Sequence, residues 1–206
     1  MIYIDENIDG FDLDEALAAV SPQRREYALR YRQERDQRLC LAAYRLLQRA
    51  LLLEYGIEEL PVFIHDDGGK PLLQGHPDIH FSMSHCHEAV ACAVSDRPIG
   101  IDIETTGHYS PEVARRVMSA GEMRQIEASP CPEVAFTRLW TMKESLFKLT
   151  GDDNGGDTAG MLANANQYRF TTTIHPCYIY TTCTPPRHKT SKKITKFPHR
   201  DRYLIK

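Results

Sequence analysis

The apolar positions of the chain follow a helical period in two long stretches. In the first, leucines and alanines recur every three or four residues from Leu39 to Leu53, and the pattern stops at Gly56. In the second, the same spacing runs through Pro132–Leu149 and stops at Gly151. Glycine directly after the last periodic residue is a common helix end. The two patterns therefore predict two long amphipathic helices, each with one apolar side.

Two serine–proline pairs predict further helix starts. Serine caps a first turn and proline fits the first helical position, so Ser21-Pro22 and Ser110-Pro111 each open a helix. The stretch from Ser21 to Gly56 is long, and we expect a break or bend near residues 31–36. Short helices are predicted at residues 12–20, 112–118 and 120–128.

Short β-prone runs predict the strands. They lie at residues 2–4, 62–65, 72–73, 79–84, 89–94, 99–104, 168–174 and 178–183. The turn-forming sequence DDGGK joins the second and third runs, which predicts a hairpin. The three runs between residues 79 and 104 have short polar connections, so we expect them to pair as an antiparallel meander.

The order of the elements predicts the architecture. A strand, a long helix and strands are followed by a strand, helices and strands, which indicates an α+β fold of two similar halves, residues 1–99 and 100–206. Residues 152–166 show no period and predict a mobile loop. The basic end, residues 185–206, predicts a last strand and a solvated tail.

Composition narrows the class of protein. Of the 206 residues, 42% are hydrophobic and 26% are charged, as in ordinary soluble domains. The formal net charge of −3 is no polyelectrolyte signature, so we expect no nucleic-acid partner. The sequence has no signal peptide or membrane-length apolar run, which predicts no membrane partner. Six cysteines without a CxxC pair predict reduced thiols in a cytoplasmic protein.

The strand GIDIE carries two carboxylates. Asp102 and Glu104 are separated by one residue, so both point to the same face of a strand, while Ile101 and Ile103 point to the other. Two carboxylates that close repel each other unless a positive charge lies between them, and Mg²⁺ suits such a site. The plain alternative is the solvent-facing side of a half-buried strand. GIDIE by itself does not exclude that alternative.

The second long helix offers a third carboxylate. Glu144 and Lys148 are four residues apart and share a helix face, away from the apolar side. They could form an ordinary surface ion pair. Trp140, the chain's one tryptophan, borders the same face, which indicates that this face lines a site.

Histidine and lysine side chains add candidate phosphate ligands. His85 follows a strand end and is placed to donate to a phosphate oxygen, as is Lys70 after the DDGG turn. A surface position is the alternative for each. A zinc site is disfavoured, because the neighbouring histidines lack the spacing that zinc sites share. Those neighbours are His76, His80 and His87.

Taken together, the motifs resemble a known family. SPQRRE at 21–26, GKP at 69–71, FSMSH at 81–85, GIDIE at 100–104 and WTMKESLFK at 140–148 occur in this order, with Arg38 on a helix between the first two. This series resembles the 4′-phosphopantetheinyl transferases of the surfactin-synthetase type. The resemblance covers residues 21 to about 151 well and the remainder loosely.

The resemblance implies a fold and a reaction. The fold has two similar halves related by an internal pseudo-two-fold axis, with the active site in the cleft between them, and the protein is a monomer, a pseudo-dimer. The reaction transfers the 4′-phosphopantetheine arm of coenzyme A to a serine of an apo acyl or peptidyl carrier protein. Adenosine 3′,5′-bisphosphate leaves. The implied metal is Mg²⁺, with Mn²⁺ as an alternative.

The resemblance also implies roles for individual residues. Asp102, Glu104 and Glu144 match the metal ligands, and Glu144 matches the proposed general base. Lys148 matches a lysine that contacts the transferred phosphate, and Ser84 and His85 match a pair at the phosphates. The remaining matches are basic positions around the adenosine phosphates, namely Arg24, Arg38 and Lys70. Tyr27 departs from the pattern, because relatives often have a second basic residue there.

Two other functions fit the same residues. A magnesium-dependent nucleotide pyrophosphohydrolase would use the three carboxylates to pass the phosphoryl group to water. A non-catalytic relative would bind coenzyme A or a carrier protein without turnover. The intact set of three carboxylates and Lys148 favours the transferase.

Overall fold

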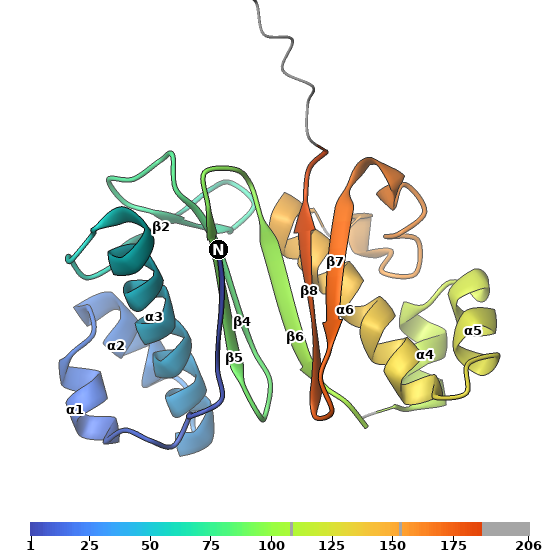
Figure 1. The fold of residues 1–206 in the computed structure, drawn as a ribbon, viewed down its shortest axis with the longest axis horizontal. Coiled ribbons are helices and arrows are strands. Elements are labelled where there is room, and N and C mark those ends of the chain that lie inside the picture. Colours follow the sequence, from blue (N-terminus) through green and yellow to red (C-terminus); the bar gives the residue numbers. More distant parts are fainter. Residues whose placement is uncertain (108, 153, 187–206) are drawn as a thin grey trace, which may run out of the picture.

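The protein is built of four layers, with helices on the outside and two antiparallel sheets between them (Figure 1). The computed structural model describes residues 1–107, 109–152 and 154–186. The predicted last strand and tail of the chain fall mainly on residues 187–206, which lie outside the described residues. Helix and strand together confirm the α+β class.

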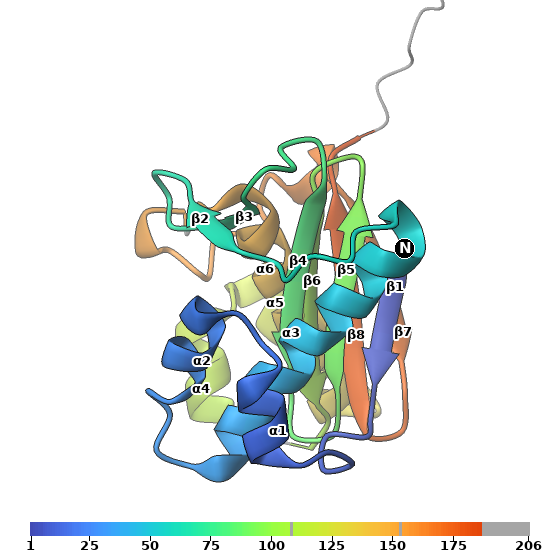
Figure 2. The same cartoon turned by 90° about the vertical axis from the view of Figure 1, so that its left-hand side faces the viewer.

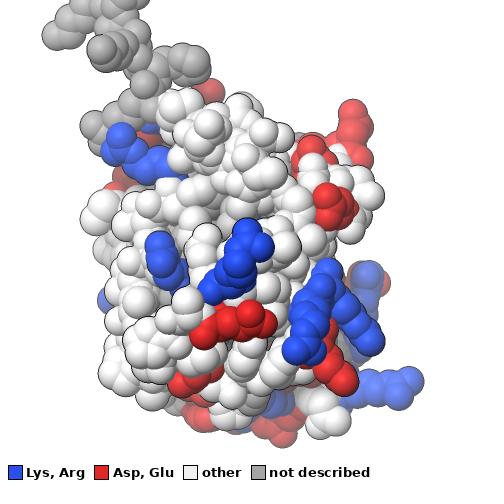
Figure 3. All heavy atoms as spheres, turned by 90° about the vertical axis from the view of Figure 1, so that its right-hand side faces the viewer, with Lys and Arg blue, Asp and Glu red and all other residues white. Residues whose placement is uncertain are grey.

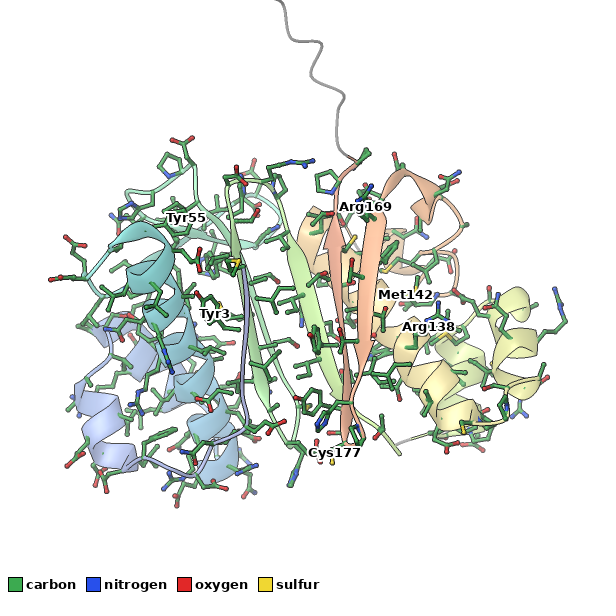
Figure 4. The ribbon with its side chains drawn as sticks, in the orientation of Figure 1. Tyr3, Tyr55, Arg138, Met142, Arg169 and Cys177 are labelled. Atoms are coloured by element: carbon green, nitrogen blue, oxygen red, sulfur yellow. The ribbon has the colours of Figure 1, made fainter. Side chains whose placement is uncertain are left out.

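The first sheet and its helices come from the first part of the chain. The strands are β1 (Ile2–Asp5), β4 (His80–His85) and β5 (Val90–Ser95), in the order β1-β5-β4. The helices are α1 (Leu13–Ala18), α2 (Pro22–Ala28) and α3 (Glu34–Tyr55). Figure 2 shows α3 lying across this sheet. Tyr3 reaches from β1 toward α3 (Figure 4), where its hydroxyl donates to Glu54.

The second sheet and its helices follow. The strands are β6 (Gly100–Thr105), β7 (Arg169–Ile174) and β8 (Tyr178–Thr184), in the order β6-β8-β7. The helices are α4 (Pro111–Val117), α5 (Ala120–Glu127) and α6 (Pro132–Thr150), with short 3₁₀ turns at Asn154–Gly156 and Ala165–Gln167. In both sheets the last strand in sequence lies in the middle, between the first strand and the one before it. Thus the two sheets share one strand order.

The hairpin predicted around DDGGK forms a sheet of its own. Its strands are β2 (Phe63–His65) and β3 (Pro71–Leu73), which pair only with each other among the described strands. Asp66 closes the turn, since its Oδ1 accepts from the backbone N–H groups of Gly68 and Lys70.

The two larger sheets pack face to face through residues of unequal size. On β5 and just before it, Ala89, Ala91 and Ala93 are fully buried and face the second sheet. Ile101 and Ile103 of β6 are also fully buried and fill the space that the alanines leave. The alternate residues of β5 point the other way and pack against α3.

The predicted meander is wrong at its third strand. β4 and β5 pair as expected, but β6 pairs with β8 in the other sheet. The physical reason is that β5 already has β1 on one edge and β4 on the other, so neither edge is free for β6. The pairing of β1 with β5 joins residues almost ninety positions apart, and no local pattern in residues 79–104 reveals it.

The helix predictions are confirmed in detail. Ser21 and Ser110 cap α2 and α4 through their side-chain oxygens, and the predicted break separates α2 from α3. Gly56 and Gly151 end the two long helices in the left-handed conformation, with φ of 66° and 71°. Among the described helices, none combines the length and hydropathy that a membrane crossing requires.

In the structure all six cysteines are free. Cys131 and Cys177 are exposed, and the other four are buried. Cys177 lies in the turn between β7 and β8, at the lower end of the molecule in Figure 4.

Candidate active site

Three of the predicted site residues meet where the two sheets adjoin. Lys148 of α6 donates from Nζ to Oδ1 of Asp102 at 2.6 Å and to Oγ of Ser84 at 2.8 Å. Ser84 Oγ in turn donates to the same Asp102 oxygen at 2.8 Å. The three residues come from β4, β6 and α6, so this contact unites both sheets and the longest helix of the second half.

Asp102 leaves one oxygen without a partner. The residue is 2% exposed, and its Oδ2 is buried with no hydrogen-bond partner among the described residues. A buried carboxylate oxygen without a partner is costly, because it has lost its water and gained nothing in return. A divalent cation bound at Oδ2 would remove that cost, so the surroundings of Asp102 suit the role of a metal ligand.

Glu104 lies beside Asp102 on the same face of β6. Trp140 of α6 donates from Nε1 to Oε1 of Glu104 at 3.2 Å. Burial, and then repulsion by Asp102, raise the pKa of Glu104 to about 7. The face of α6 that carries Trp140 therefore contacts a carboxylate of β6, and its role in a site stays a prediction.

The pKa of Glu144, on α6, is raised for the same two reasons as that of Glu104. Burial raises its pKa first, and the negative charge of Asp102 raises it further, while Lys148 opposes the shift. The three predicted metal ligands are thus close enough to repel one another and only partly neutralised by Lys148. In the described part of the chain, no three His, Cys, Asp or Glu side chains already surround one point as a metal site would require. The metal-binding role of the three carboxylates stays a prediction.

β6 approaches α6 closely because residue 100 has no side chain. A Cβ on Gly100 would lie 2.0 Å from the backbone oxygen of Ser145 and 2.7 Å from the backbone nitrogen of Leu149. Both atoms belong to the helix backbone and cannot rotate away. Glycine at this position lets β6 bring Asp102 against Lys148.

Replacing Gly100 by alanine should therefore displace β6 from α6. We expect Gly100→Ala to lower the free energy of unfolding by at least about 1–3 kcal/mol, as overpacked sites do. It should also lower activity by moving Asp102. Urea unfolding measures the first effect. Gly121→Ala is the matched control, because a Cβ there meets nothing closer than 3.9 Å in helix α5; an equal loss in both variants would contradict the prediction.

Ser82 fixes β6 from the other side. Its Oγ accepts from the backbone N–H of Ile101 at 3.0 Å, a buried contact between β4 and β6. The sequence analysis missed Ser82. Its place two residues before Ser84, on the same strand face, is the signal that could have found it.

A cavity of about 430 Å³ opens beside Ser84. Arg24 and His85 also line it, together with the hairpin residues Phe63, His65 and Gly69. The Arg24 guanidinium lies about 5 Å from the ring centres of Tyr27, Tyr44 and Phe63. The structure thus brings Arg24, Ser84 and His85 to one cavity, and their phosphate-binding roles stay predictions.

His85 is exposed at the rim of this cavity. Crowding by surrounding protein atoms, and then the positive charge of Lys148, lower its pKa. A lowered pKa favours the neutral imidazole, which still has one N–H to donate to a phosphate oxygen.

A smaller cavity of about 240 Å³ lies on the other side of the hairpin. Lys70 and Lys148 both line it, with Phe81, Met83 and Phe147. Lys70 Nζ donates to the backbone oxygen of Leu149 at 2.8 Å, and burial lowers its pKa. In this structure Lys70 therefore binds the C-terminal end of α6.

Arg38 is the predicted site residue that the structure does not bring to the others. Its guanidinium donates to the backbone oxygen of Phe11 at 2.7 Å and pairs with Glu34 at 2.8 Å. It lines neither of the two cavities. The helical pattern placed Arg38 on α3 correctly but could not show to which side of α3 it points.

A buried ion pair next to Glu144 also escaped the sequence analysis. Lys143 is fully buried, and its Nζ lies 3.0 Å from Oε2 of Glu122 at the start of α5. The same Nζ donates to the backbone oxygens of Thr158 and Ala159. Lys143 therefore ties α5 and the segment after α6 to α6 itself.

The fold and site define a class of protein in which carboxylates and basic side chains meet where two α+β units adjoin. Comparisons with known proteins agree. A sequence model of the 4′-phosphopantetheinyl transferase superfamily matches residues 98–197. The 4′-phosphopantetheinyl transferase Sfp of Bacillus subtilis (strain 168) is 33% identical over 153 residues, which cover 73% of this chain and 68% of that protein. The transferase psf-1 of Bacillus pumilus is 36% identical over 135 residues, covering 64% and 58%.

The chain belongs to the 4′-phosphopantetheinyl transferase superfamily and is a transferase. A third relative, the transferase gsp of Aneurinibacillus migulanus, is 34% identical over 141 residues, covering 64% of this chain and 56% of that protein.

Proposed function

We propose that this protein transfers the 4′-phosphopantetheine arm of coenzyme A to a serine hydroxyl of an apo acyl or peptidyl carrier protein. The observation that carries the proposal is the buried Asp102, bound to Ser84 and Lys148 and left with a free Oδ2, beside Glu104 and Glu144. Such a site suits phosphoryl transfer from a pyrophosphate, because that reaction depends on fixed cations and hydrogen-bond donors more than on covalent catalysis.

Asp102, Glu104 and Glu144 would hold a divalent cation, which we propose is Mg²⁺, although Mn²⁺ suits the same oxygen ligands. A cation there supplies positive charge that neutralises the pyrophosphate. The residues of the chain do the rest. Lys148 holds the phosphate that is transferred, and His85 and Arg24 donate to the phosphates in the larger cavity.

The reaction itself is a displacement at phosphorus. The carrier serine oxygen attacks the β-phosphorus of coenzyme A, and the bond from that phosphorus to the bridging oxygen breaks. The serine proton passes to the Glu144 carboxylate, and adenosine 3′,5′-bisphosphate leaves with the bridging oxygen. Lys148 keeps the phosphate aligned with the attacking oxygen.

The partner side of the proposal rests on surface charge. Figure 3 shows the side of the molecule where α4 and α5 lie, with Lys and Arg side chains prominent among acidic ones. Arg115 and Arg116 lie in the last turn of α4, and Arg124 lies in the last turn of α5. Such arginines would steer an acidic helix of a carrier protein toward the site.

Three finer points belong to the same proposal. The shared strand order of the two sheets supports two similar halves, residues 1–99 and 100–206, related by a pseudo-two-fold axis with the site between them. A chain that already contains both halves suits a monomer. Free cysteines suit the cytoplasm.

The test uses labelled coenzyme A and an apo carrier protein. We expect label on the carrier serine with Mg²⁺ present, no label after chelation, and recovery when Mg²⁺ is restored. Absence of label in every condition, with acyl and peptidyl carriers alike, would refute the proposal. Hydrolysis of coenzyme A without a carrier would favour the pyrophosphohydrolase. Binding without turnover would favour a non-catalytic relative.

A further inference from the structure

The β2–β3 hairpin depends on outside contacts for its position. It is a two-stranded sheet that pairs with neither larger sheet within the described residues. An isolated two-stranded hairpin is marginally stable in water. Figure 2 shows it beside β4, above α2 and near α6. Side chains from both helices contact it: Gln23 of α2 binds the backbone of Phe63, and Lys70 of the hairpin turn binds the end of α6.

Gln23 of α2 provides one of these contacts. Its Nε2 donates to the backbone oxygen of Phe63 at 2.9 Å, and its Oε1 accepts from the Phe63 N–H at 3.0 Å. The amide thus pairs with both backbone groups of one strand residue, as a neighbouring strand would. The amide of glutamine supplies the donor and the acceptor together.

Phe63 connects this contact to the larger cavity. Its ring stacks on Phe81, with centres 5.2 Å apart, and packs edge-on against Tyr44. The Arg24 guanidinium lies 5.1 Å from the centre of the same ring. Phe63 therefore forms part of the cavity wall and contacts a cation of the same cavity, so a shift of its ring would alter both the wall and the surroundings of Arg24.

The other end of the hairpin is tied to α6. Lys70 donates to the backbone oxygen of Leu149, a contact between residues 79 positions apart in the chain. Gly69 and Pro71 line both the larger and the smaller cavity, so the hairpin is the wall that the two cavities share. Gln23 holds the base of that wall and Lys70 holds its tip.

We propose that Gln23 is a positioning residue for the donor: its amide fixes the β2–β3 hairpin as a wall of the donor cavity. This inference rests on the proposed function, since it takes coenzyme A as the occupant. Gln23 acts through Phe63 and the hairpin, and its effect belongs to donor binding. The kcat and the KM for the carrier protein do not depend on it.

The test compares Gln23→Ala and Gln23→Glu with the wild-type chain. Gln23→Ala removes both hydrogen bonds, while Gln23→Glu keeps the acceptor and loses the donor at nearly unchanged shape. We expect the Kd and KM for coenzyme A to rise about five- to tenfold in both variants, with kcat and carrier KM within about twofold. Hydrogen exchange of the Phe63 amide should become faster in Gln23→Ala. Gln125→Glu on the exposed side of α5 is the control for the added charge.

The outcomes separate this inference from the proposed function. Faster exchange at Phe63 with unchanged coenzyme A affinity would overturn the inference, because the contact would then be structural only. Unchanged exchange would also overturn it, because the contact would not hold the hairpin. If the wild-type chain neither binds coenzyme A nor modifies a carrier, the proposed function fails and the inference fails with it. Exchange at Phe63 still reports separately whether Gln23 holds the hairpin.

Discussion

Replacing Glu144 by glutamine should lower kcat for carrier modification by about 10²–10⁴-fold, the usual contribution of a general base. Glutamine has nearly the same shape but cannot accept the serine proton, and it binds a hard cation more weakly than a carboxylate. Initial rates with labelled coenzyme A and saturating carrier protein measure the effect.

The fold should survive this substitution. Burial and the charge of Asp102 raise the pKa of Glu144, which means that its ionised form is disfavoured in the folded protein without a cation. Removing that charge should leave the Tm unchanged or raise it. Glu127→Gln, on the exposed surface of α5, is the control and should keep full activity. A Glu144→Gln variant with near wild-type kcat would exclude Glu144 as the base.

Lys143→Met should destabilise the protein by about 3–5 kcal/mol, the cost of leaving a buried charge without its partner. Glu122 would lose the ammonium 3.0 Å away, and the backbone oxygens of Thr158 and Ala159 would lose their donor. The midpoint of urea unfolding measures the change, provided that the free energy of unfolding depends on urea concentration with the same slope in both proteins.

A double variant tests the cause of that loss. Glu122→Gln removes the carboxylate charge but keeps an oxygen for the backbone N–H of Ser119, which Glu122 accepts at the start of α5. We expect Lys143→Met with Glu122→Gln to be more stable than Lys143→Met alone, because no buried charge then lacks a partner. A loss below about 0.5 kcal/mol in the single variant would show that the pair behaves like an exposed one.

Local chemistry made most of the fold predictable. Serine–proline starts and glycine ends act within one helical turn, so Ser21, Ser110, Gly56 and Gly151 marked helices correctly. Strand partners depend on the whole chain. The meander failed because β1, at the N-terminus, takes the edge of β5 that β6 was expected to use.

The candidate site shows the same division. Residue spacing placed Asp102 and Glu104 on one strand face and Glu144 and Lys148 on one helix face, and the structure brings these faces together. Residue spacing in the sequence could not show which charged groups already have hydrogen-bond or ion-pair partners in the folded protein. Arg38 is bound to Phe11 and Glu34, and Lys70 to Leu149, so their free-cation roles remain predictions. The contacts of Gln23 and Lys143 join segments that no motif relates.

The unequal faces of the two sheets have a consequence for assembly. One sheet offers the flat alanine surface of β5, and the other offers the branched isoleucines of β6. Two flat faces placed together would leave a void, and two branched faces would collide. Each sheet therefore fits the other sheet of its own chain, and it does not fit a second copy of itself. That asymmetry disfavours the pairing of two first sheets or of two second sheets from different molecules, a hazard for chains built from similar units.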